Sequence, residues 1–149
     1  MMDPYIICET DDFCPLTIFF HQCGLEMKPG APRPENLVKM WRMEDPDNGE
    51  LLGAAILEIR DDVYTLSDLG VREDRRNKGY GKVLQNIVFD EARRLSVKEL
   101  WGVAKVPSYY YPLGWKKVDW DAAPKIAIKC DGCQQRGVEC DPVVLKYAL

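Results

Sequence analysis

A basic turn with two glycines is the part of this sequence whose residue types point most directly to ligand chemistry. Its residues are Arg76, Asn77, Lys78, Gly79, Tyr80 and Gly81, flanked by Arg75 and Lys82. Glycine has no side chain, so backbone N–H groups near it can approach a ligand closely. If a helix begins here, its first N–H groups have no partners within the helix and lie at the positive end of its dipole. Such a turn suits a pyrophosphate group.

The charge of this turn stands out against the rest of the chain, whose formal net charge is -4. All four cations of the turn and its flanks fall within residues 75–82. The simpler interpretation is a helix start with a basic surface, because a pair of glycines alone is a weak signal. Two other phosphate-binding motifs do not fit. No Gly-Lys-Ser/Thr sequence follows, and position 84, where the dinucleotide fingerprint needs a third glycine, is Leu84.

Two stretches of the chain, taken together, carry a more specific signal than the glycines. The first is residues 69–81, which read Leu-Gly-Val, four residues, then Arg-x-x-Gly-x-Gly. The second is residues 109–115, which read Tyr-Tyr-Tyr-Pro-Leu-Gly-Trp. They resemble the central cofactor motif and the later Phe-Tyr-x-x-Leu-Gly-Phe element of the GNAT superfamily of N-acetyltransferases. The resemblance covers residues 51–118, whereas both ends of the chain match only loosely.

The resemblance implies acetyl-CoA as a cosubstrate and assigns residues to it. The pantetheine arm would bond to the backbone of Leu69 and Val71, in an opening between their strand and the next one. The N–H groups of residues 76–82 would hold the pyrophosphate, and an amide near Leu69 could polarise the thioester carbonyl. The implied cofactor-binding residues are Leu69, Gly70, Val71, Arg76, Asn77, Lys78, Gly79, Tyr80, Gly81 and Lys82.

Tyr110 occupies the position of the family's tyrosine, so the resemblance implies that it protonates the departing CoA thiolate. A phenol with a pKa of about 10 is a suitable donor to this leaving group. The chain departs from the family after the strand predicted over residues 98–105. Many members carry an asparagine there, and this sequence has Val-Ala-Lys-Val-Pro over residues 103–107.

Glu58 is the candidate general base, because a substrate amine must lose a proton before it attacks the thioester. A two-residue turn at residues 61–62 would place Glu58 on the same face as Leu69 and Val71. There, Glu58 either takes the proton, directly or through water, or is a strand-end carboxylate in solvent. His21 has no sequence partner to orient it, and we interpret it as a surface or core residue.

Six cysteines fall into an N-terminal and a C-terminal group. Cys130 and Cys133 have the spacing of a metal-ligand pair, and Cys140 follows. A structural zinc site needs a fourth ligand, and no local histidine or cysteine supplies one. Cys8, Cys14, Cys23 or His21 could supply it only if its segment folds back onto this loop. The loop near residues 130–140 is therefore predicted to contain free thiols, with a bound metal as the alternative. A nucleophilic cysteine is not needed when the amine attacks the thioester directly.

The hydrophobic periodicity predicts the elements that must position these residues. Strands are predicted over residues 5–8, 37–43, 51–59, 63–71, 98–105, 116–120 and 142–147, and helices over 13–23, 79–95 and 108–113. This order indicates an α/β, GNAT-like fold, in which a mixed and mostly antiparallel sheet has helices on both faces. With 149 residues, the chain is predicted to form a single domain over residues 1–149.

The composition narrows the class of protein and its partners. A pI of 5.1 provides no basic field for nucleic acid, so no nucleic-acid partner is expected. No apolar run has the length of a membrane helix, so no membrane association is expected. The first residues lack the basic start and apolar middle of a secretory leader, and we expect a cytoplasmic location. Family analogy suggests a homodimer.

The sequence thus predicts an acyl-CoA-dependent N-acyltransferase that transfers an acetyl group to a primary amine by direct attack. The acceptor would be a small-molecule or peptide amine. Two alternatives belong to other classes: a noncatalytic acyl-CoA-binding sensor or interaction domain, and a small metal-binding module built on the C-terminal cysteines. Release of free CoA in the presence of an amine separates the enzyme from the sensor.

Overall fold

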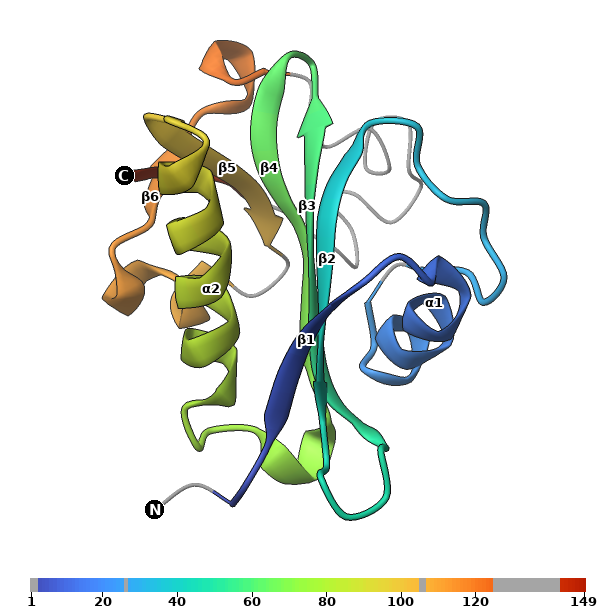
Figure 1. Cartoon of the computed structure of the whole chain (residues 1–149). Helices are drawn as coiled ribbons and strands as arrows, with labels where there is room; N and C mark the ends of the chain where they lie inside the picture. Colours follow the sequence, from blue (N-terminus) through green and yellow to red (C-terminus); the bar gives the residue numbers. More distant parts are fainter. Residues whose placement is uncertain (1–2, 26, 105–106, 125–142) are drawn as a thin grey trace. The chain divides into compact units, whose positions relative to one another are not determined.

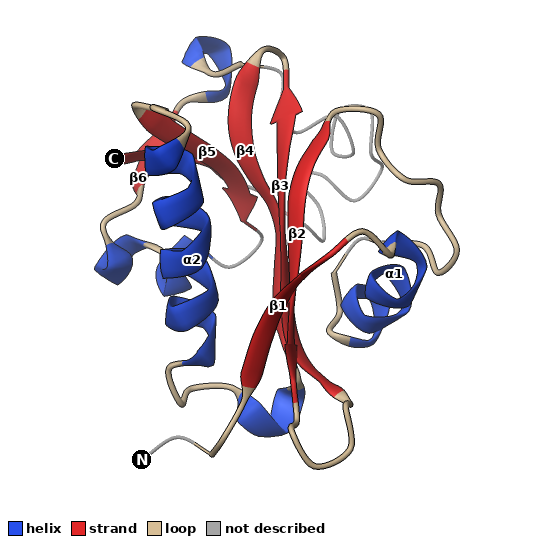
Figure 2. Ribbon diagram, in the orientation of Figure 1, coloured by secondary structure: helices blue, strands red, loops and turns tan. Residues whose placement is uncertain are grey.

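The computed structural model describes residues 3–25, 27–104, 107–124 and 143–149 (Figure 1). The strands are β1 (Ile6–Thr10), β2 (Leu37–Glu44), β3 (Leu51–Arg60), β4 (Val63–Val71), β5 (Glu99–Ala104), β6 (Lys116–Val118) and β7 (Val143–Ala148). The α-helices are α1 (Phe13–Gln22) and α2 (Tyr80–Arg94), and the short 3-10 helices are η1 (Glu73–Arg75), η2 (Pro107–Tyr109), η3 (Tyr111–Leu113) and η4 (Trp120–Ala122) (Figure 2).

The described strands form one sheet of seven strands in the order β1-β2-β3-β4-β5-β7-β6. β4 and β5 run parallel, with Thr65 opposite Trp101. The pairs β1–β2, β2–β3, β5–β7 and β6–β7 are antiparallel. The predicted fold class, a mixed and mostly antiparallel sheet with helices, is confirmed. The chain divides into two compact units, residues 1–58 with 66–91 and residues 59–65 with 92–149, and each is described by itself.

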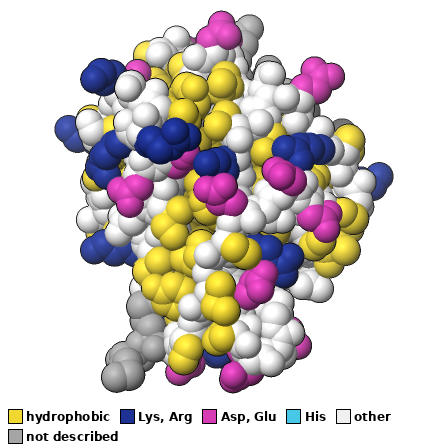
Figure 3. Space-filling model, viewed as in Figure 1, with side chains coloured by type: hydrophobic (Ala, Val, Ile, Leu, Met, Phe, Trp, Pro, Cys, Tyr) yellow, Lys and Arg dark blue, Asp and Glu magenta, His cyan; other side chains and the backbone are white. Residues whose placement is uncertain are grey.

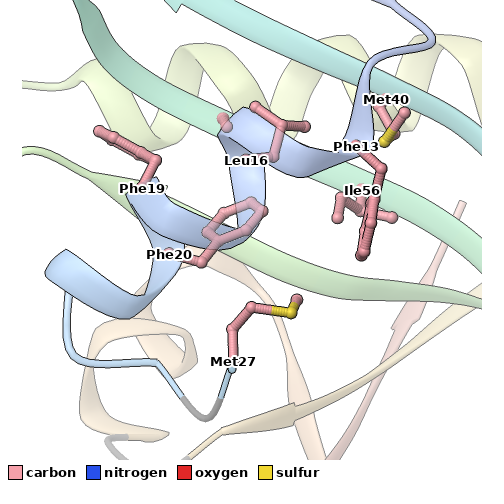
Figure 4. Close-up of a cluster of buried hydrophobic side chains, with 8 residues drawn as sticks. Phe13, Leu16, Phe19, Phe20, Met27, Met40 and Ile56 are labelled. Carbon is pink, nitrogen blue, oxygen red and sulfur yellow. The ribbon is translucent and has the colours of Figure 1, made fainter. Parts of the chain in front are cut away.

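In the first unit, α1 covers one face of the sheet with a cluster of buried apolar side chains (Figure 4). The cluster contains Phe13, Leu16, Phe19 and Phe20 from α1, Met27 from the following loop, Met40 from β2, and Ala54 and Ile56 from β3. The helix begins and ends close to the predicted positions. Its N-cap, Asp12, makes no side-chain capping bond, and Gly24 follows the helix with φ 87°.

On the other face of this unit, α2 packs closely against β3. A Cβ atom at Gly53 would lie only 2.8 Å from Cδ1 of Leu84, so glycine allows the helix to approach the strand. Nζ of Lys39 on β2 lies 3.0 Å from a carboxylate oxygen of Glu91, which is buried on α2. The first unit therefore has a helix on each face of its strands, as predicted.

The second unit is built on the antiparallel pairing of β5, β7 and β6. Trp101 and Val144 form the buried pair of an apolar cluster, and Nζ of Lys146 lies 5.5 Å from the Trp101 ring centroid. The single helix predicted over residues 108–113 is wrong, since η2 and η3 replace it. Pro112 provides no N–H for a longer helix, and a left-handed glycine closes η3 at residue 114.

Of two further sequence predictions, one is corrected by the structure and the other falls outside the described residues. The strand predicted over residues 116–120 is shorter, because β6 ends at Val118 and η4 follows. The cysteine loop near residues 130–140 lies outside the described residues. Within the described residues, no helix combines the length and apolarity needed to cross a membrane.

Candidate functional site

The basic turn joins β4 to α2 in the first unit, and its backbone geometry differs from that of a plain helix start. Asn77 and Gly79 both have positive φ values, 62° and 94°, on either side of Lys78. Backbone that alternates between left- and right-handed conformations directs successive N–H groups into a concave, anion-binding arrangement. Asparagine tolerates the left-handed region better than most residues, and glycine has no penalty there. The residue types of the turn thus match its conformation.

The first turn of α2 leaves its positive end without an acidic partner. The helix begins at Tyr80, and the amide of Val83 donates to Gly79 O at 3.2 Å. The N–H groups before Val83 have no acceptor within the helix, as is usual for a first turn. This first turn, all of it described, contains no acidic side chain. An anion bound here would therefore meet both free N–H groups and the positive end of the helix dipole.

The cations around the turn do not all have the same surroundings. Arg72, which sequence reasoning missed, lies 2.6 Å from a carboxylate oxygen of Asp74 and 3.2 Å from one of Glu50. Hydrogen bonding to Arg72 is the main reason that the pKa of Asp74 is lowered. Arg75 also contacts Asp74, at 3.2 Å. On the face shown in Figure 3, basic and acidic side chains are interspersed rather than gathered in one block.

Lys78 and Lys82 are both exposed, in contrast to the arginines that contact acids. The four cations predicted from the sequence therefore separate into those held by acidic or backbone partners and those displayed to solvent. The exposed lysines are the residues of the turn most suited to meet a phosphate charge.

Arg76 has its hydrogen-bonding groups directed into the protein. Its Nε donates to Val71 O and its Nη2 to Cys23 O, both at 3.0 Å. Its amide donates to Glu73 O at 3.3 Å, as part of the η1 turn. Arg76 thus joins the end of β4, the end of α1 and the basic turn. The sequence analysis placed Arg76 among the cofactor-binding residues. Because its amide already donates to Glu73 O, Arg76 would contribute its positive charge and its bonds to the neighbouring elements, and not a free N–H group.

The end of β4 carries a one-residue shift in its pairing with β3. A two-residue turn at Asp61 and Asp62, whose φ values are 48° and 62°, would place Gly53 opposite Gly70. A Cβ atom at Gly53 would meet Leu84 of α2, whereas one at Gly70 would lie 3.1 Å from Phe20 of α1. The two glycines therefore face opposite sides of the sheet and are not directly opposite each other. The register set by that turn would pair Arg72 with Leu51, but the amide of Arg72 donates to the oxygen of the next residue, Leu52. An extra residue, as in a β-bulge, therefore precedes Gly70.

This shift overturns one prediction about Glu58. Alternation along β3 places Glu58 on the α1 face, with Ile56. Val71 alternates with Gly70 and therefore faces the opposite side of the sheet. Glu58 does not share a face with Val71, because the bulge reverses the alternation at the end of β4. Its side chain is only 4% exposed, which excludes the solvent-exposed alternative. Its role as general base stays a prediction.

His21 has the surroundings of a surface residue, one of the two that the sequence analysis expected. Asp68 is buried on β4. His21 is exposed on α1, and its Nδ1 lies 3.2 Å from Met27 O. Cys23 lies at the C-cap of α1. Its Sγ lies 3.6 Å from Val71 O, and burial raises the pKa of its thiol, although the nearby Arg76 guanidinium opposes this shift.

In the second unit, Tyr110 belongs to a chain of aromatic rings. Its ring centroid lies 5.0 Å from that of Tyr109 and 5.9 Å from that of Trp115, both in edge-on geometry. Trp115 is buried, and its ring centroid lies 5.6 Å from that of Tyr147 on β7. These contacts orient the Tyr110 ring on a packed support, as a positioned proton donor requires. The proton-donor role itself stays a prediction.

Comparison with known proteins bears on the sequence motifs and the fold. Residues 8–108 match the model of the acetyltransferase (GNAT) family. The chain belongs to this family. GNAT proteins are acyl-CoA-dependent N-acyltransferases, so the predicted enzyme class is confirmed. The match includes the β4–α2 turn and ends before Tyr109.

Solved structures show the same fold at low sequence identity. N-acetylglutamate synthase from Neisseria gonorrhoeae, complexed with coenzyme A and N-acetyl-glutamate, is 17% identical, with a TM-score of 0.72. That match covers 100% of this chain and 36% of the synthase, so this chain spans little more than a third of that length.

Two other matches span both chains almost completely. The IAA acetyltransferase from Bacillus cereus is 17% identical, with a TM-score of 0.69, and 98% of this chain matches 100% of that one. A GNAT family acetyltransferase from Elizabethkingia anophelis with acetyl-CoA bound is 18% identical, with a TM-score of 0.59 and 99% of each chain covered. Solved chains with the fold of this GNAT protein therefore include some that it spans almost completely and one of which it is only a part.

Proposed function

We propose that this protein transfers an acetyl group from acetyl-CoA to a primary amine by direct attack of the amine on the thioester. The observation that carries the proposal is the β4–α2 turn. It combines two left-handed residues, a first helical turn without acids, and exposed lysines. A pyrophosphate is the group of CoA that fits this combination. Neighbours bound to coenzyme A or acetyl-CoA support the choice of cosubstrate.

The proposed reaction assigns a proton transfer to each of two side chains. The neutral amine nitrogen bonds to the thioester carbonyl carbon, and the bond from that carbon to sulfur breaks. Glu58, the predicted general base, would take through water the proton that the amine loses, because its buried side chain lies on the α1 face of the sheet. Tyr110 gives a proton to the departing thiolate. A backbone N–H at the irregular end of β4 would stabilise the negative charge that develops on the carbonyl oxygen.

The acceptor is proposed to be a small-molecule or peptide amine. The product named with the N-acetylglutamate synthase complex is an N-acetylated amino acid, which supports an amine as acceptor here. The acidic net charge of -4 favours a cationic amine over an anionic acceptor.

Calorimetric titration with acetyl-CoA tests the cosubstrate assignment. Lys78→Ala removes an exposed charge from the turn, and Lys28→Ala makes the same change in the loop after α1 as a control. We expect Lys78→Ala to weaken binding about fivefold, because one charge pair near 4 Å in water is worth about 1 kcal/mol. Lys28→Ala should bind like the wild type. A folded wild type that does not bind acetyl-CoA would refute the proposal.

Release of free CoA in the presence of a panel of primary amines tests turnover. Tyr110→Phe should bind acetyl-CoA but release CoA at least about 100-fold more slowly, because a positioned proton donor contributes about 10²–10⁴-fold. Binding without release by the wild type, across amino acids, polyamines and peptides, would favour the noncatalytic sensor instead.

A further inference from the structure

The N-terminal segment contacts both ends of the basic turn, and we name residues 3–5 the N-terminal strap. The backbone oxygen of Asp3 accepts a hydrogen bond from the Tyr80 hydroxyl at 3.1 Å. A carboxylate oxygen of Asp3 lies 3.8 Å from Nη2 of Arg75. The ring of Tyr5 meets that of Tyr80 edge-on, with centroids 5.8 Å apart. Figure 1 shows this blue segment beside the turn that leads into α2.

Tyr80 is the residue through which the strap reaches the proposed pyrophosphate site. It is the first residue of α2, and its side chain is only 1% exposed. It follows Gly79, whose φ of 94° is accessible to few other residues. A residue between two glycines has little local restraint from its neighbours. The contacts of its side chain therefore fix where α2 begins and where the N–H groups of its first turn point.

The strap is stiff by its own sequence. Proline fixes its own φ near −65° and restricts the preceding residue to extended conformations, so Pro4 also restrains Asp3. A stiff segment loses little conformational entropy when it docks. Both residues are exposed, so they do not fill the core. Their contribution to the fold is the contacts made by Asp3 with Arg75 and Tyr80.

We propose that the N-terminal strap is a positioning element for the acyl-CoA site. It holds Tyr80, and with it the turn over residues 76–82, in the arrangement that receives the pyrophosphate. The inference rests on the proposed function, because it requires acetyl-CoA to bind at this turn. A site that is already ordered binds more tightly, since less conformational freedom is lost on binding. The strap therefore acts on affinity for acetyl-CoA rather than on the acyl-transfer step.

A double-mutant cycle on the full chain tests this coupling. Tyr80→Phe removes the hydroxyl that bonds to Asp3 O, and a double variant, Asp3→Gly with Pro4→Gly, loosens the strap without changing the core. Pro46→Gly makes the same proline replacement in the turn after β2 and is the control. The four members of the cycle are the wild type, each variant and their combination. Acetyl-CoA affinity is measured by calorimetry, and each protein's fold is checked by circular dichroism.

We expect Tyr80→Phe to weaken acetyl-CoA binding by about two- to tenfold, the range of one hydrogen bond. The loosened strap should weaken it similarly, with the loss in KM for acetyl-CoA and not in kcat. Adding Tyr80→Phe to the loosened strap should then cost less than about twofold, because the two changes remove the same restraint. Pro46→Gly should leave the affinity unchanged.

Two results would overturn the strap proposal while leaving the proposed function intact. The first result is an equal affinity for acetyl-CoA in the wild type and in the loosened-strap variant. The other is a Tyr80→Phe loss of the same size in both backgrounds, which would show that the hydroxyl acts independently of the strap. A wild type that does not bind acetyl-CoA would instead refute the proposed function. If Tyr80→Phe does not fold, the exposed loosened-strap variant alone decides the first comparison.

Discussion

Replacement of Arg76 by lysine tests whether this side chain braces the basic turn. Nε donates to Val71 O and Nη2 to Cys23 O, both at 3.0 Å. Lysine keeps the positive charge, but a single ammonium group does not reproduce the planar fork of a guanidinium. Arg76→Lys should therefore lose about one of the two bonds, and Arg76→Ala should lose both.

The expected loss follows from the value of a hydrogen bond. A net contribution of about 0.5–1.5 kcal/mol is typical, and the exposed position of Arg76 lets a freed carbonyl turn to water. We expect Arg76→Lys to lower the free energy of unfolding by about 1 kcal/mol and Arg76→Ala by about 2 kcal/mol. In a chain of about this length, 1 kcal/mol corresponds to a fall in Tm of about 2–4 °C.

Urea unfolding followed by circular dichroism measures the effect, with Arg33→Lys as a matched control. Arg33 makes one bond of this type, from Nη1 to Asp11 O at 2.8 Å, which a lysine can replace. The control should change the free energy of unfolding by less than about 0.5 kcal/mol. If Arg76→Lys unfolds at the same urea concentration as the wild type, Arg76 is not a brace. A role in direct contact with the cofactor would then be the better explanation.

Three further predictions concern stability and reactivity. Gly114→Ala should lower the free energy of unfolding by about 2 kcal/mol or more, because it combines a φ of 102° with a Cβ 2.9 Å from Tyr147 Cε2. Gly49→Ala, with φ 72° and no atom within 4 Å, should lose less in the same urea titration, and equal losses would contradict the packing argument. The pKa of Asp74 is lowered by the adjacent guanidinium, so its contribution to stability is present above about pH 4 and lost as the pH falls through the lowered value. Urea midpoints of Asp74→Asn should accordingly lie below those of the wild type at pH 6 and converge with them in acid, whereas a constant difference would exclude this cause. Burial raises the pKa of the Cys23 thiol, so iodoacetamide should label it more slowly than free glutathione at pH 7, as followed by mass spectrometry, and faster labelling would contradict its buried setting.

The sequence by itself determined the long strands and helices and the turn that carries the proposed chemistry. The positions of β4, α2 and the turn between them follow from hydrophobic periodicity and from two glycines, which are local properties of the chain. The left-handed conformation of Gly79 agrees with the reason that glycine was singled out there. Family membership follows from the same local pattern, because the motif spacing is preserved in the sequence itself.

Only the tertiary structure decided which groups around the turn are bonded within the protein and which are displayed. The sequence treats Arg76 and Lys78 as equivalent cations, but Arg76 bonds to carbonyls of α1 and β4, and Lys78 is exposed. The bulge before Gly70 reverses the faces at the end of β4, so Val71 lies on the opposite side of the sheet from Glu58. The contact between Asp3 and Tyr80 joins residues 77 positions apart. Such long-range contacts depend on how the elements pack, and no local pattern of residues specifies them.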